Sequence, residues 1–374
     1  MKVWVVSHAY VTPVNHDKLR ALAALGDVAL TVMIPDGWRT PTGMVRLPRV
    51  DAPYPIVTSR ISQNGRIGAY RYRDLAPLRR ARPDIVHGEV EPWSLAALQL
   101  VRAAAGAPVV LFTWENLAGP RRLLSRAVER YVLARAAHVI AGNEGARTRM
   151  RRLGVGDDRL TVLPQLGIDP PRFAHGDGAR AAGVPPADGA PMIGFIGRVV
   201  PEKGIDVLLD AAAGLDVRVL IVGDGAARAA LEARTAGWPA GKATFAGAVA
   251  DADVPHYLAR LDALVLPSRT TASWAEQFGH VLIEAMAAGV PVVGSSSGAI
   301  PEVIGDAGLV FTEGDASALA AQLDGLVRDA ALRKRLAERG RARVERLYTN
   351  DRVARTQRDL YLRLLRRHKG EDAT

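Results

Sequence analysis

One segment of this chain, residues 261–295, restricts the possible folds more than any other. Residues 261–267 are an apolar run typical of a buried strand, and residues 281–288 are helix formers with one apolar face. Gly289 is well suited to end that helix, because glycine readily adopts the left-handed conformation that follows many helices. A second apolar run occupies residues 290–293. Strand, loop, helix and strand in this order are typical of an α/β protein with a parallel sheet.

Two glutamates in this segment suggest a ligand. Glu276 lies in the loop before the helix, and Glu284 lies about one turn inside it. The unpaired backbone N–H groups and the helix dipole make a helix N-terminus a site for a phosphate. The residues expected at that phosphate are Phe278, Gly279, His280 and Val281. A phosphate beside two carboxylates that accept hydrogen bonds from hydroxyl groups fits a nucleotide sugar, although both glutamates could also be solvated charges on an ordinary helix.

The stretch from Glu276 to residue 293, Glu-Gln-Phe-Gly-His-Val-Leu-Ile-Glu-Ala-Met-Ala-Ala-Gly-Val-Pro-Val-Val, resembles a known signature. It is that of the retaining glycosyltransferases of family 4, the glycosyl transferases group 1, which have the GT-B fold. Gln277 stands where proline is usual, and His280 stands where leucine is frequent. The resemblance implies that Glu284 holds the ribose hydroxyls of the donor. It implies that Glu276 orients the reacting sugar and takes part in catalysis.

The same resemblance implies an α/β fold with two Rossmann-like, doubly wound domains that face a cleft. Residues 1–170, completed by 352–374, are expected to form the acceptor domain. Residues 171–351 are expected to form the nucleotide-sugar domain. The last helix is expected to cross back onto the N-terminal domain.

Apolar runs and helical patterns place the expected elements along the chain. In the first domain strands are predicted at 2–8, 28–34, 45–47, 85–86, 109–112, 139–141 and 161–163, and helices at 17–25, 75–80, 94–105, 123–136 and 145–153. The second domain has predicted strands at 192–196, 217–222, 244–245, 263–266, 290–293 and 309–311, followed by helices at 316–328, 332–347 and 351–366. The proline- and glycine-rich stretches 164–173 and 176–191 indicate an interdomain linker.

The composition excludes several classes of protein. The 374 residues contain no cysteine, which excludes disulfides, thiolate metal sites and a cysteine nucleophile. No apolar run approaches the roughly 18 residues of a membrane-spanning helix, and the first residues lack a signal-peptide cleavage pattern. We therefore expect a cytoplasmic protein.

The formal charge of +10 suggests an anionic partner, or arginine used as a general solubilising residue. We expect no nucleic-acid binding, because no reading motif and no aromatic residues interleaved with the basic clusters are found. A protein that acts on lipid-linked phosphates at an anionic leaflet would also be basic. Peripheral contact with the inner face of a membrane is therefore one prediction.

A second motif supplies fixed positive charges. Gly197 ends a predicted strand, and Arg198 and Lys203 follow it in a loop. Two cations there could hold a diphosphate and stabilise the charge that develops as it leaves, so no divalent metal and no cofactor are expected. The motif resembles the Gly-Arg-x-x-x-x-Lys-Gly donor loop of the same glycosyltransferases; the alternative is an ordinary surface loop. The resemblance also implies that Gly223 and Val249 line the nucleotide base.

Polar residues at the ends of strands in the first domain are candidates for binding the acceptor or the transferred sugar. They are Tyr10, Asn15, His16, Glu91, Glu115 and Asn116. Many relatives have a Gly-Gly turn in place of the loop at residues 9–16, so the role of that loop stays open. Glu115 and Asn116 could instead form a turn that caps the next helix.

The resemblance, supported by these features, implies a retaining hexosyltransferase of polysaccharide biosynthesis. It would move a sugar from a UDP- or GDP-sugar to a hydroxyl of a glycan, glycolipid or small glycoside, by a metal-independent front-face mechanism. A dehydrogenase would need Gly-x-Gly-x-x-Gly after the first strand, and residues 7–12 contain no glycine. The remaining alternative is a basic membrane- or nucleic-acid-binding module with a degenerate sugar-nucleotide site.

Overall fold

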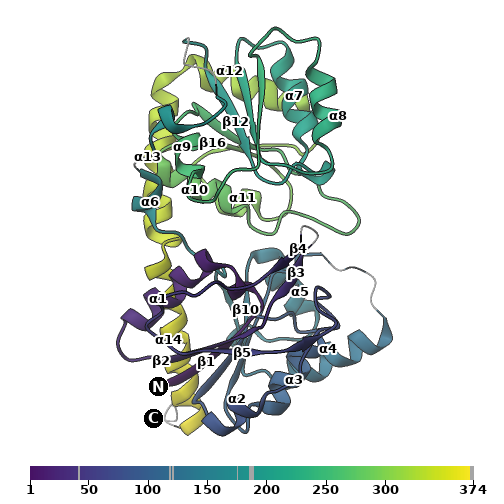
Figure 1. Cartoon of the computed structure of the whole chain (residues 1–374), viewed down its shortest axis with the longest axis vertical. Coiled ribbons are helices and arrows are strands. Elements are labelled where there is room, and N and C mark those ends of the chain that lie inside the picture. Colours follow the sequence, from purple (N-terminus) through teal and green to yellow (C-terminus); the bar gives the residue numbers. More distant parts are fainter. Residues whose placement is uncertain (41–42, 118, 120–121, 175, 185–188, 371–374) are drawn as a thin grey trace. The chain divides into compact units, whose positions relative to one another are not determined.

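The computed structural model describes residues 1–40, 43–117, 119, 122–174, 176–184 and 189–370. The chain divides into two compact units, each built on a parallel sheet (Figure 1). Unit 1 comprises Met1–Gly167 and Asn350–Thr374, and unit 2 comprises Ile168–Thr349. The last helix, α14 (Asn350–Lys369), therefore belongs to the first unit, as expected.

The described residues of unit 1 form a seven-stranded parallel sheet in the order β11-β10-β9-β8-β1-β2-β5. Its strands are β1 (Lys2–Val6), β2 (Ala29–Pro35), β5 (Ile56–Ser59), β8 (Ile85–Gly88), β9 (Val109–Thr113), β10 (His138–Ala141) and β11 (Leu160–Val162). The connecting helices are α1 (His16–Ala24), α2 (Ala76–Ala81), α3 (Leu95–Ala103), α4 (Leu123–Arg135) and α5 (Glu144–Arg152). Two small hairpins, β3 (Trp38–Thr40) with β4 (Gly43–Val45) and β6 (Ile61–Ser62) with β7 (Arg71–Tyr72), lie beside it.

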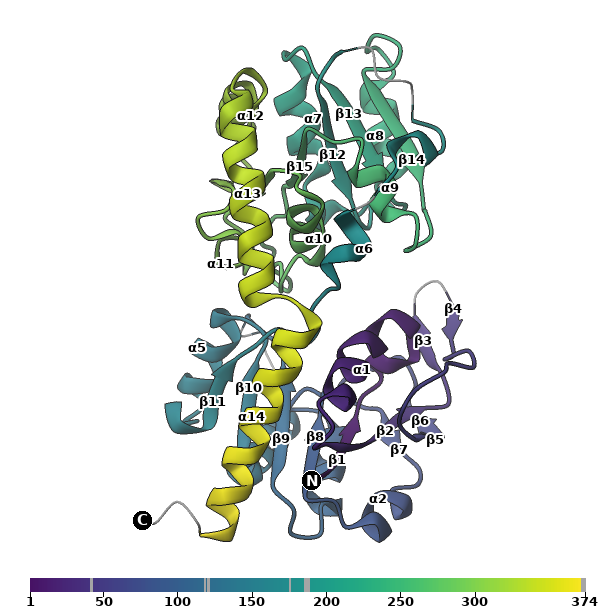
Figure 2. The same cartoon turned by 90° about the vertical axis from the view of Figure 1, so that its left-hand side faces the viewer.

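Both faces of the unit 1 sheet are buried, which explains its nearly continuous apolar strands. Helices α2 to α5 cover one face, where Val86, Leu111 and Val139 point. Helices α1 and α14 cover the other face, where Val5 and Val110 point. Figure 2 shows α14 lying along the strands of this unit. The C-terminal helix thus contributes to the core of the unit that the N-terminus begins.

The described residues of unit 2 form a six-stranded parallel sheet in the order β14-β13-β12-β15-β16-β17. Its strands are β12 (Met192–Ile196), β13 (Arg218–Val222), β14 (Ala243–Gly247), β15 (Ala263–Leu266), β16 (Val292–Ser295) and β17 (Leu309–Phe311). Its helices are α6 (Pro170–Ala174), α7 (Ile205–Ala213), α8 (Arg228–Thr235), α9 (Val254–Leu258), α10 (His280–Ala288), α11 (Ile300–Ile304), α12 (Ala316–Arg328) and α13 (Ala330–Leu347). Helix α10 packs against α6, α9 and α13, and α7 packs against α8 and α12.

Each sheet has one point at which the strand order reverses. In unit 1 the first strand, β1, lies between β2 and β8, and in unit 2 the first strand, β12, lies between β13 and β15. In open α/β sheets, ligands bind outside the carboxyl ends of the strands at such a point. The loops that follow β12 and β15 are therefore the first place to examine in unit 2.

The structure corrects three expectations about elements. Residues 45–47 are not a strand of the main sheet, since β4 ends at Val45 and pairs only with β3 among the described strands. The edge strand β5 was not expected, and it is short and preceded by a proline. The stretch expected to be a linker contains α6, which packs against α10 and α9.

Over the part of the chain that the structure describes, no helix combines the length and the apolar character needed to cross a bilayer.

Candidate active site

The loops after β12 and β15 meet at the reversal point of unit 2. The Lys203 Nζ atom lies 2.5 Å from Glu276 Oε2, and the Ser268 hydroxyl donates to the same oxygen at 2.7 Å. The side chains of Lys203 and Glu276 are only 13% and 8% exposed. Two motifs separated by 73 residues in the sequence thus form one charged pair at the carboxyl edge of the sheet.

The backbone fixes the position of Glu276. Its carbonyl oxygen accepts a hydrogen bond of 2.9 Å from the N–H group of Ala299, in the loop after β16. A Cβ atom at Gly298 would lie 2.0 Å from that same oxygen, so no larger residue fits there without movement. The Ser295 hydroxyl donates to the Ser268 carbonyl, which ties the end of β16 to the end of β15. These contacts hold the backbone of the loop that carries the Glu276 carboxylate in one position.

Arg198 differs from Lys203 in its exposure. The Arg198 side chain is 66% exposed, and its nearest carboxylate, Glu202, is 3.9 Å away. The Lys203 ammonium lies 5.1 Å from the centre of the Trp274 ring, a distance at which a cation and an aromatic face attract each other. Arg198 is thus accessible to a ligand, whereas Lys203 is held by Glu276 and Trp274. Trp274 was not expected here, because an isolated tryptophan in a loop has no distinguishing sequence pattern.

Glycines let the loops after β12, β13 and β14 pack closely. A Cβ atom at Gly223, whose φ is +131°, would lie 1.8 Å from the carbonyl oxygen of Gly197. The Gly223 N–H group donates to the Gly247 carbonyl at 2.8 Å. Val249 lies partly buried in the loop that follows. These glycines are explained by contacts between loops, so their presence alone does not indicate a nucleotide base.

The first turn of α10 has a distinctive geometry. Gly279 precedes the helix with φ of +82°, and a Cβ atom there would lie 2.7 Å from the Leu266 side chain. The Phe278 side chain is 5% exposed and packs edge-on against Tyr348, so Phe278 can contact a ligand only through its backbone. The His280 ring packs against Phe278 in a tilted arrangement, and burial lowers the pKa of its imidazole to about 4, which leaves it neutral at pH 7. Val281 is partly buried in the same turn.

Glu284 faces a different environment from Glu276. It is partly buried on α10, and burial, assisted by the negative charge of Asp251, raises the pKa of its carboxyl group to about 7. Arg172 lowers that pKa but is itself paired with Asp251 at 2.9 Å. The two glutamates therefore lie in the environments of different cations, and Glu284 is poised between its neutral and ionised forms near neutral pH.

In unit 1 the structure does not support two of the residues expected to bind the acceptor. Tyr10 is fully buried, and its hydroxyl donates to Glu89 Oε1 at 2.7 Å. His16 is also fully buried, with Nδ1 2.9 Å from the Tyr54 hydroxyl and Nε2 2.8 Å from the Tyr10 carbonyl oxygen. Both side chains support the loop after β1 and have no surface to offer a ligand. Asn15, which is partly buried, donates to the Ala9 carbonyl in the same loop.

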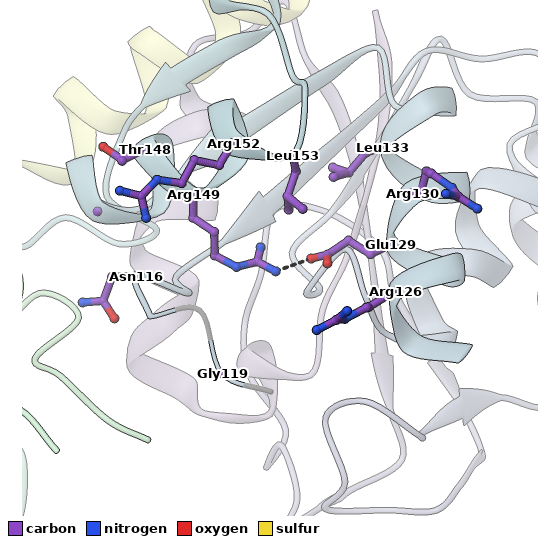
Figure 3. Close-up of a pocket in the computed structure, with 11 residues that line it drawn as sticks. Asn116, Gly119, Arg126, Glu129, Arg130, Leu133, Thr148, Arg149, Arg152 and Leu153 are labelled. Atoms are coloured by element: carbon purple, nitrogen blue, oxygen red, sulfur yellow. Dashed lines mark hydrogen bonds and ion pairs between the residues drawn. The ribbon is translucent and has the colours of Figure 1, made fainter. Parts of the chain in front are cut away.

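The other three expected residues lie at the ends of β8 and β9. Glu91 accepts hydrogen bonds from the Thr113 hydroxyl at 2.6 Å and the Trp114 N–H group at 3.0 Å, so it joins the two strand ends. Glu115 lies 3.4 Å from Arg149 on α5. Asn116 lines a cavity between α4 and α5 (Figure 3).

A buried ion pair in unit 1 was not foreseen. Lys18 on α1 pairs with Glu89 after β8, and their side chains are 1% and 0% exposed. Gln165 donates to the second oxygen of Glu89 at 2.7 Å. Burial alone would raise the pKa of Glu89, but Lys18, His87 and the hydrogen bond from Gln165 lower it below the usual value. A lysine early in a helix and a glutamate after a strand give no sequence signal that they pair.

Among the described residues, no group of three or more His, Cys, Asp or Glu side chains is arranged to hold a metal ion. The positive charge in contact with Glu276 is that of Lys203.

Comparisons with known proteins extend over both units. The family model described as "Glycosyl transferases group 1" matches residues 181–343, and that described as "Glycosyl transferase 4-like domain" matches residues 11–165. A crystal structure of Anabaena Alr3699/HepE in complex with UDP is similar to this chain with a TM-score of 0.71 and 18% identity, covering 97% of this chain and 99% of that one.

Three characterised proteins are similar in sequence. A 2-deoxystreptamine N-acetyl-D-glucosaminyltransferase of Streptomyces fradiae is 34% identical over 68% of this chain and 65% of its own length. A 2-deoxystreptamine glucosyltransferase of Streptomyces kanamyceticus is 32% identical over 76% of this chain and 81% of its own length. A GDP-mannose-dependent monoacylated alpha-(1-6)-phosphatidylinositol monomannoside mannosyltransferase of Corynebacterium glutamicum is 31% identical over 62% of this chain and 71% of its own length.

Proposed function

The chain belongs to the group 1 glycosyltransferases, enzymes of the GT-B fold that transfer a sugar from a nucleotide sugar, and on this premise we propose a retaining, metal-independent hexosyltransferase that uses a UDP- or GDP-sugar. The observation that carries the proposal is the pairing of Lys203 with Glu276 at the reversal point of unit 2, beside the N-terminus of α10. Membership of this family also removes the reason to regard the chain as a binding module with a degenerate site.

In the proposed donor complex, the diphosphate binds to Arg198, to Lys203 and to the first backbone N–H groups of α10. Arg198 is exposed and ready to bind, and its guanidinium can donate two parallel hydrogen bonds to phosphate oxygens. The Lys203 ammonium has three donors, so it can contact a phosphate while it keeps its contact with Glu276. Glu284 accepts hydrogen bonds from the ribose hydroxyls.

The proposed reaction proceeds on one face of the sugar. The bond between the anomeric carbon and the diphosphate oxygen breaks, and its electron pair goes to that oxygen. The acceptor hydroxyl oxygen forms the new bond on the same face, and its proton moves to the departing phosphate. Arg198 and Lys203 stabilise the negative charge on the phosphate, while Glu276 orients the sugar and balances positive charge at the anomeric carbon.

We further propose a cytoplasmic protein of polysaccharide or glycolipid biosynthesis with peripheral contact to an anionic membrane. The start of α4 supports this proposal. Leu123 and Leu124 are 83% and 73% exposed, and Arg122 and Arg126 beside them are also exposed. Two exposed leucines among arginines match the apolar interior and the negative headgroups of such a membrane.

A thermal-shift panel of UDP-, GDP- and ADP-sugars tests the donor assignment. A ligand present at about 100 times its Kd adds about 2.7 kcal/mol of stability, so the true donor should stand out. NMR of the product then gives the anomeric configuration, and an inverted product would refute retention. Full activity after treatment with EDTA is expected, and complete loss that Mg²⁺ or Mn²⁺ restores would refute metal independence.

Sedimentation with vesicles tests membrane contact. Binding to vesicles with anionic lipid, but not to neutral ones, is expected, and the double variant Leu123→Ser/Leu124→Ser should reduce it. Equal sedimentation with both kinds of vesicle would show that the basic surface has no role in membrane binding.

A further inference from the structure

The cavity between α4 and α5 in unit 1 is lined by none of the residues assigned to the donor. Its volume is about 630 Å³, which is within the range of about 300–1,000 Å³ of small-molecule sites. Four of its lining residues are arginines, namely Arg126, Arg130, Arg149 and Arg152, and one is a glutamate, Glu129 (Figure 3). The excess of positive charge indicates an anionic ligand.

Arg149 lies at the base of this cavity and is only 7% exposed. Its guanidinium contacts Glu129 at 2.6 Å and Glu115 at 3.4 Å, so its charge is compensated inside the protein. The Nη1 atom of Arg149 is nevertheless buried without a hydrogen-bond partner among the described residues. A buried donor left unpaired is unfavourable, and an acceptor atom of a ligand in the cavity would satisfy it.

The other three arginines are exposed around Arg149. Within the described ranges of the chain, no carboxylate forms an ion pair with Arg126, Arg130 or Arg152. These side chains project from two different helices, α4 and α5 (Figure 3). Exposed guanidinium groups on both helices, together with the buried N–H donor of Arg149, favour an anionic ligand with several oxygen acceptors, such as a phosphate.

We propose that this cavity binds a phosphate group of the acceptor. This inference rests on the proposed function, because it assigns the cavity to a substrate of the same reaction. The link to the acceptor comes from β9: Glu115 and Asn116 follow that strand at the carboxyl edge of the sheet, and they contact Arg149 and line the cavity respectively. Ligands of open α/β sheets bind at that edge.

The positive charge of the cavity also argues against a cationic acceptor. 2-Deoxystreptamine, which appears in the names of two relatives, carries amino groups that are cationic at neutral pH. Arginines without carboxylate partners would repel such an acceptor. The acceptor chemistry of those two relatives therefore does not transfer to this chain, and a phosphorylated acceptor is expected instead.

Calorimetric titration with inorganic phosphate tests the proposal, with the donor site filled by the nucleoside diphosphate that stabilises the protein best. The variant is Arg130→Gln/Arg152→Gln, in which both replaced side chains are exposed and lie outside the proposed membrane contact, so folding should be unaffected. The matched control is Arg135→Gln/Arg151→Gln, which makes the same charge change on the same two helices outside the cavity. The cavity variant should bind phosphate about 10-fold more weakly or worse, and the control should stay within about twofold of wild type.

A second arm identifies the source of the phosphate, using phosphatidylcholine vesicles that contain phosphatidylinositol. If the cavity variant loses phosphate binding but keeps vesicle binding, the acceptor is a soluble phosphorylated molecule. If it loses both while the control keeps both, the phosphate belongs to a lipid headgroup. Equal phosphate binding by wild type and the cavity variant overturns the proposal. Failure of every nucleoside diphosphate to bind would instead refute the proposed function, so the two failures are distinguishable.

Discussion

Both units place a lysine–glutamate pair beside their first strand, yet the two pairs differ in their surroundings. Glu89 follows β8, the neighbour of β1, and Glu276 lies in the loop after β15, the neighbour of β12. The Lys18–Glu89 side chains are 1% and 0% exposed, whereas those of Lys203–Glu276 are 13% and 8% exposed. In unit 1, Tyr10 and Gln165 complete the hydrogen bonding of the carboxylate.

The exposure of the neighbouring groups distinguishes an ion pair that only stabilises the fold from one that a substrate can reach. In unit 1 the protein's own side chains occupy the reversal point, since buried Lys18, buried Tyr10 and half-buried Gln165 all bind the Glu89 carboxylate. In unit 2, by contrast, the loop that carries Lys203 also carries Arg198, a cation that is 66% exposed. The same two residue types at equivalent positions therefore stabilise one unit and, on our proposal, act on substrate in the other.

Replacing Lys18 should cause the largest loss of stability. Lys18→Met leaves the Glu89 carboxylate buried without its cation, which should cost about 3–5 kcal/mol in the free energy of unfolding, measured by urea denaturation. The double variant Lys18→Met/Glu89→Gln should recover much of the loss, because no uncompensated charge remains. Lys203→Met should cost clearly less, and equal losses in the two units would remove the distinction between the pairs.

The next prediction is a loss of catalytic rate on replacing Glu276. Glu276→Gln should lower kcat by about 10²-fold or more while the Kd of the nucleotide stays near wild type, because the carboxylate acts at the reacting sugar. Its unfolding free energy should change little. Steady-state kinetics and nucleotide titration on the same preparation check both points, and a near-normal kcat would rule out the catalytic role.

Arg198 tests the exposed cation of unit 2. Arg198→Ala removes a charge-assisted contact of about 1.5–3 kcal/mol and should weaken nucleoside diphosphate binding roughly 10- to 100-fold. Arg328→Ala, an exposed arginine on α12, is the matched control and should bind as wild type does. Unchanged affinity in Arg198→Ala would show that the loop after β12 does not hold the diphosphate.

The last effect depends on pH, through Glu284. Because its pKa is raised to about 7 in the folded protein, the folded state retains a proton that the unfolded chain releases near pH 4.5. Stability should therefore fall as pH rises from about 4.5 to 7 and then level off. Glu284→Gln should lack this decline, so its Tm should match wild type at low pH and exceed it above pH 7. Parallel Tm–pH curves for the two proteins would contradict the assignment.

Nucleotide affinity should show the opposite trend with pH. The ionised Glu284 carboxylate is the better acceptor for ribose hydroxyls, so wild-type affinity should rise by up to about 10-fold between pH 6 and 8. In Glu284→Gln this rise should vanish and KM should increase more than kcat falls.

Local pattern predicts regular elements well in this chain. The strand Met192–Ile196 and the helix Ala316–Arg328 coincide with their predicted limits, because a continuous apolar run and a clear helical period leave little ambiguity. The strand Ile56–Ser59 escaped notice because four residues after a proline resemble a loop. A strand that forms mainly because it pairs with a neighbouring strand is harder to predict from its own residues.

Burial in the site is harder to predict than secondary structure. Tyr10 and His16 are polar residues in a loop, which suggested exposure, but their partners Glu89 and Tyr54 lie 79 and 38 residues away in sequence. The approach of Lys203 to Glu276 was foreseeable only because each belongs to a recognisable motif. Lys18, Glu89 and the arginine-lined cavity have no such motif, so only tertiary structure reveals them.

The position of α14 has a consequence for synthesis on the ribosome. Val353, Leu360 and Tyr361 pack into the core of unit 1 with Leu19 and Ile85. This core is therefore incomplete until the last helix has left the ribosome. At about 5–20 residues per second, translation from Gly167 to α14 takes roughly 10–40 s. During that interval unit 2 can fold, while the apolar face of unit 1 that α14 will cover stays exposed.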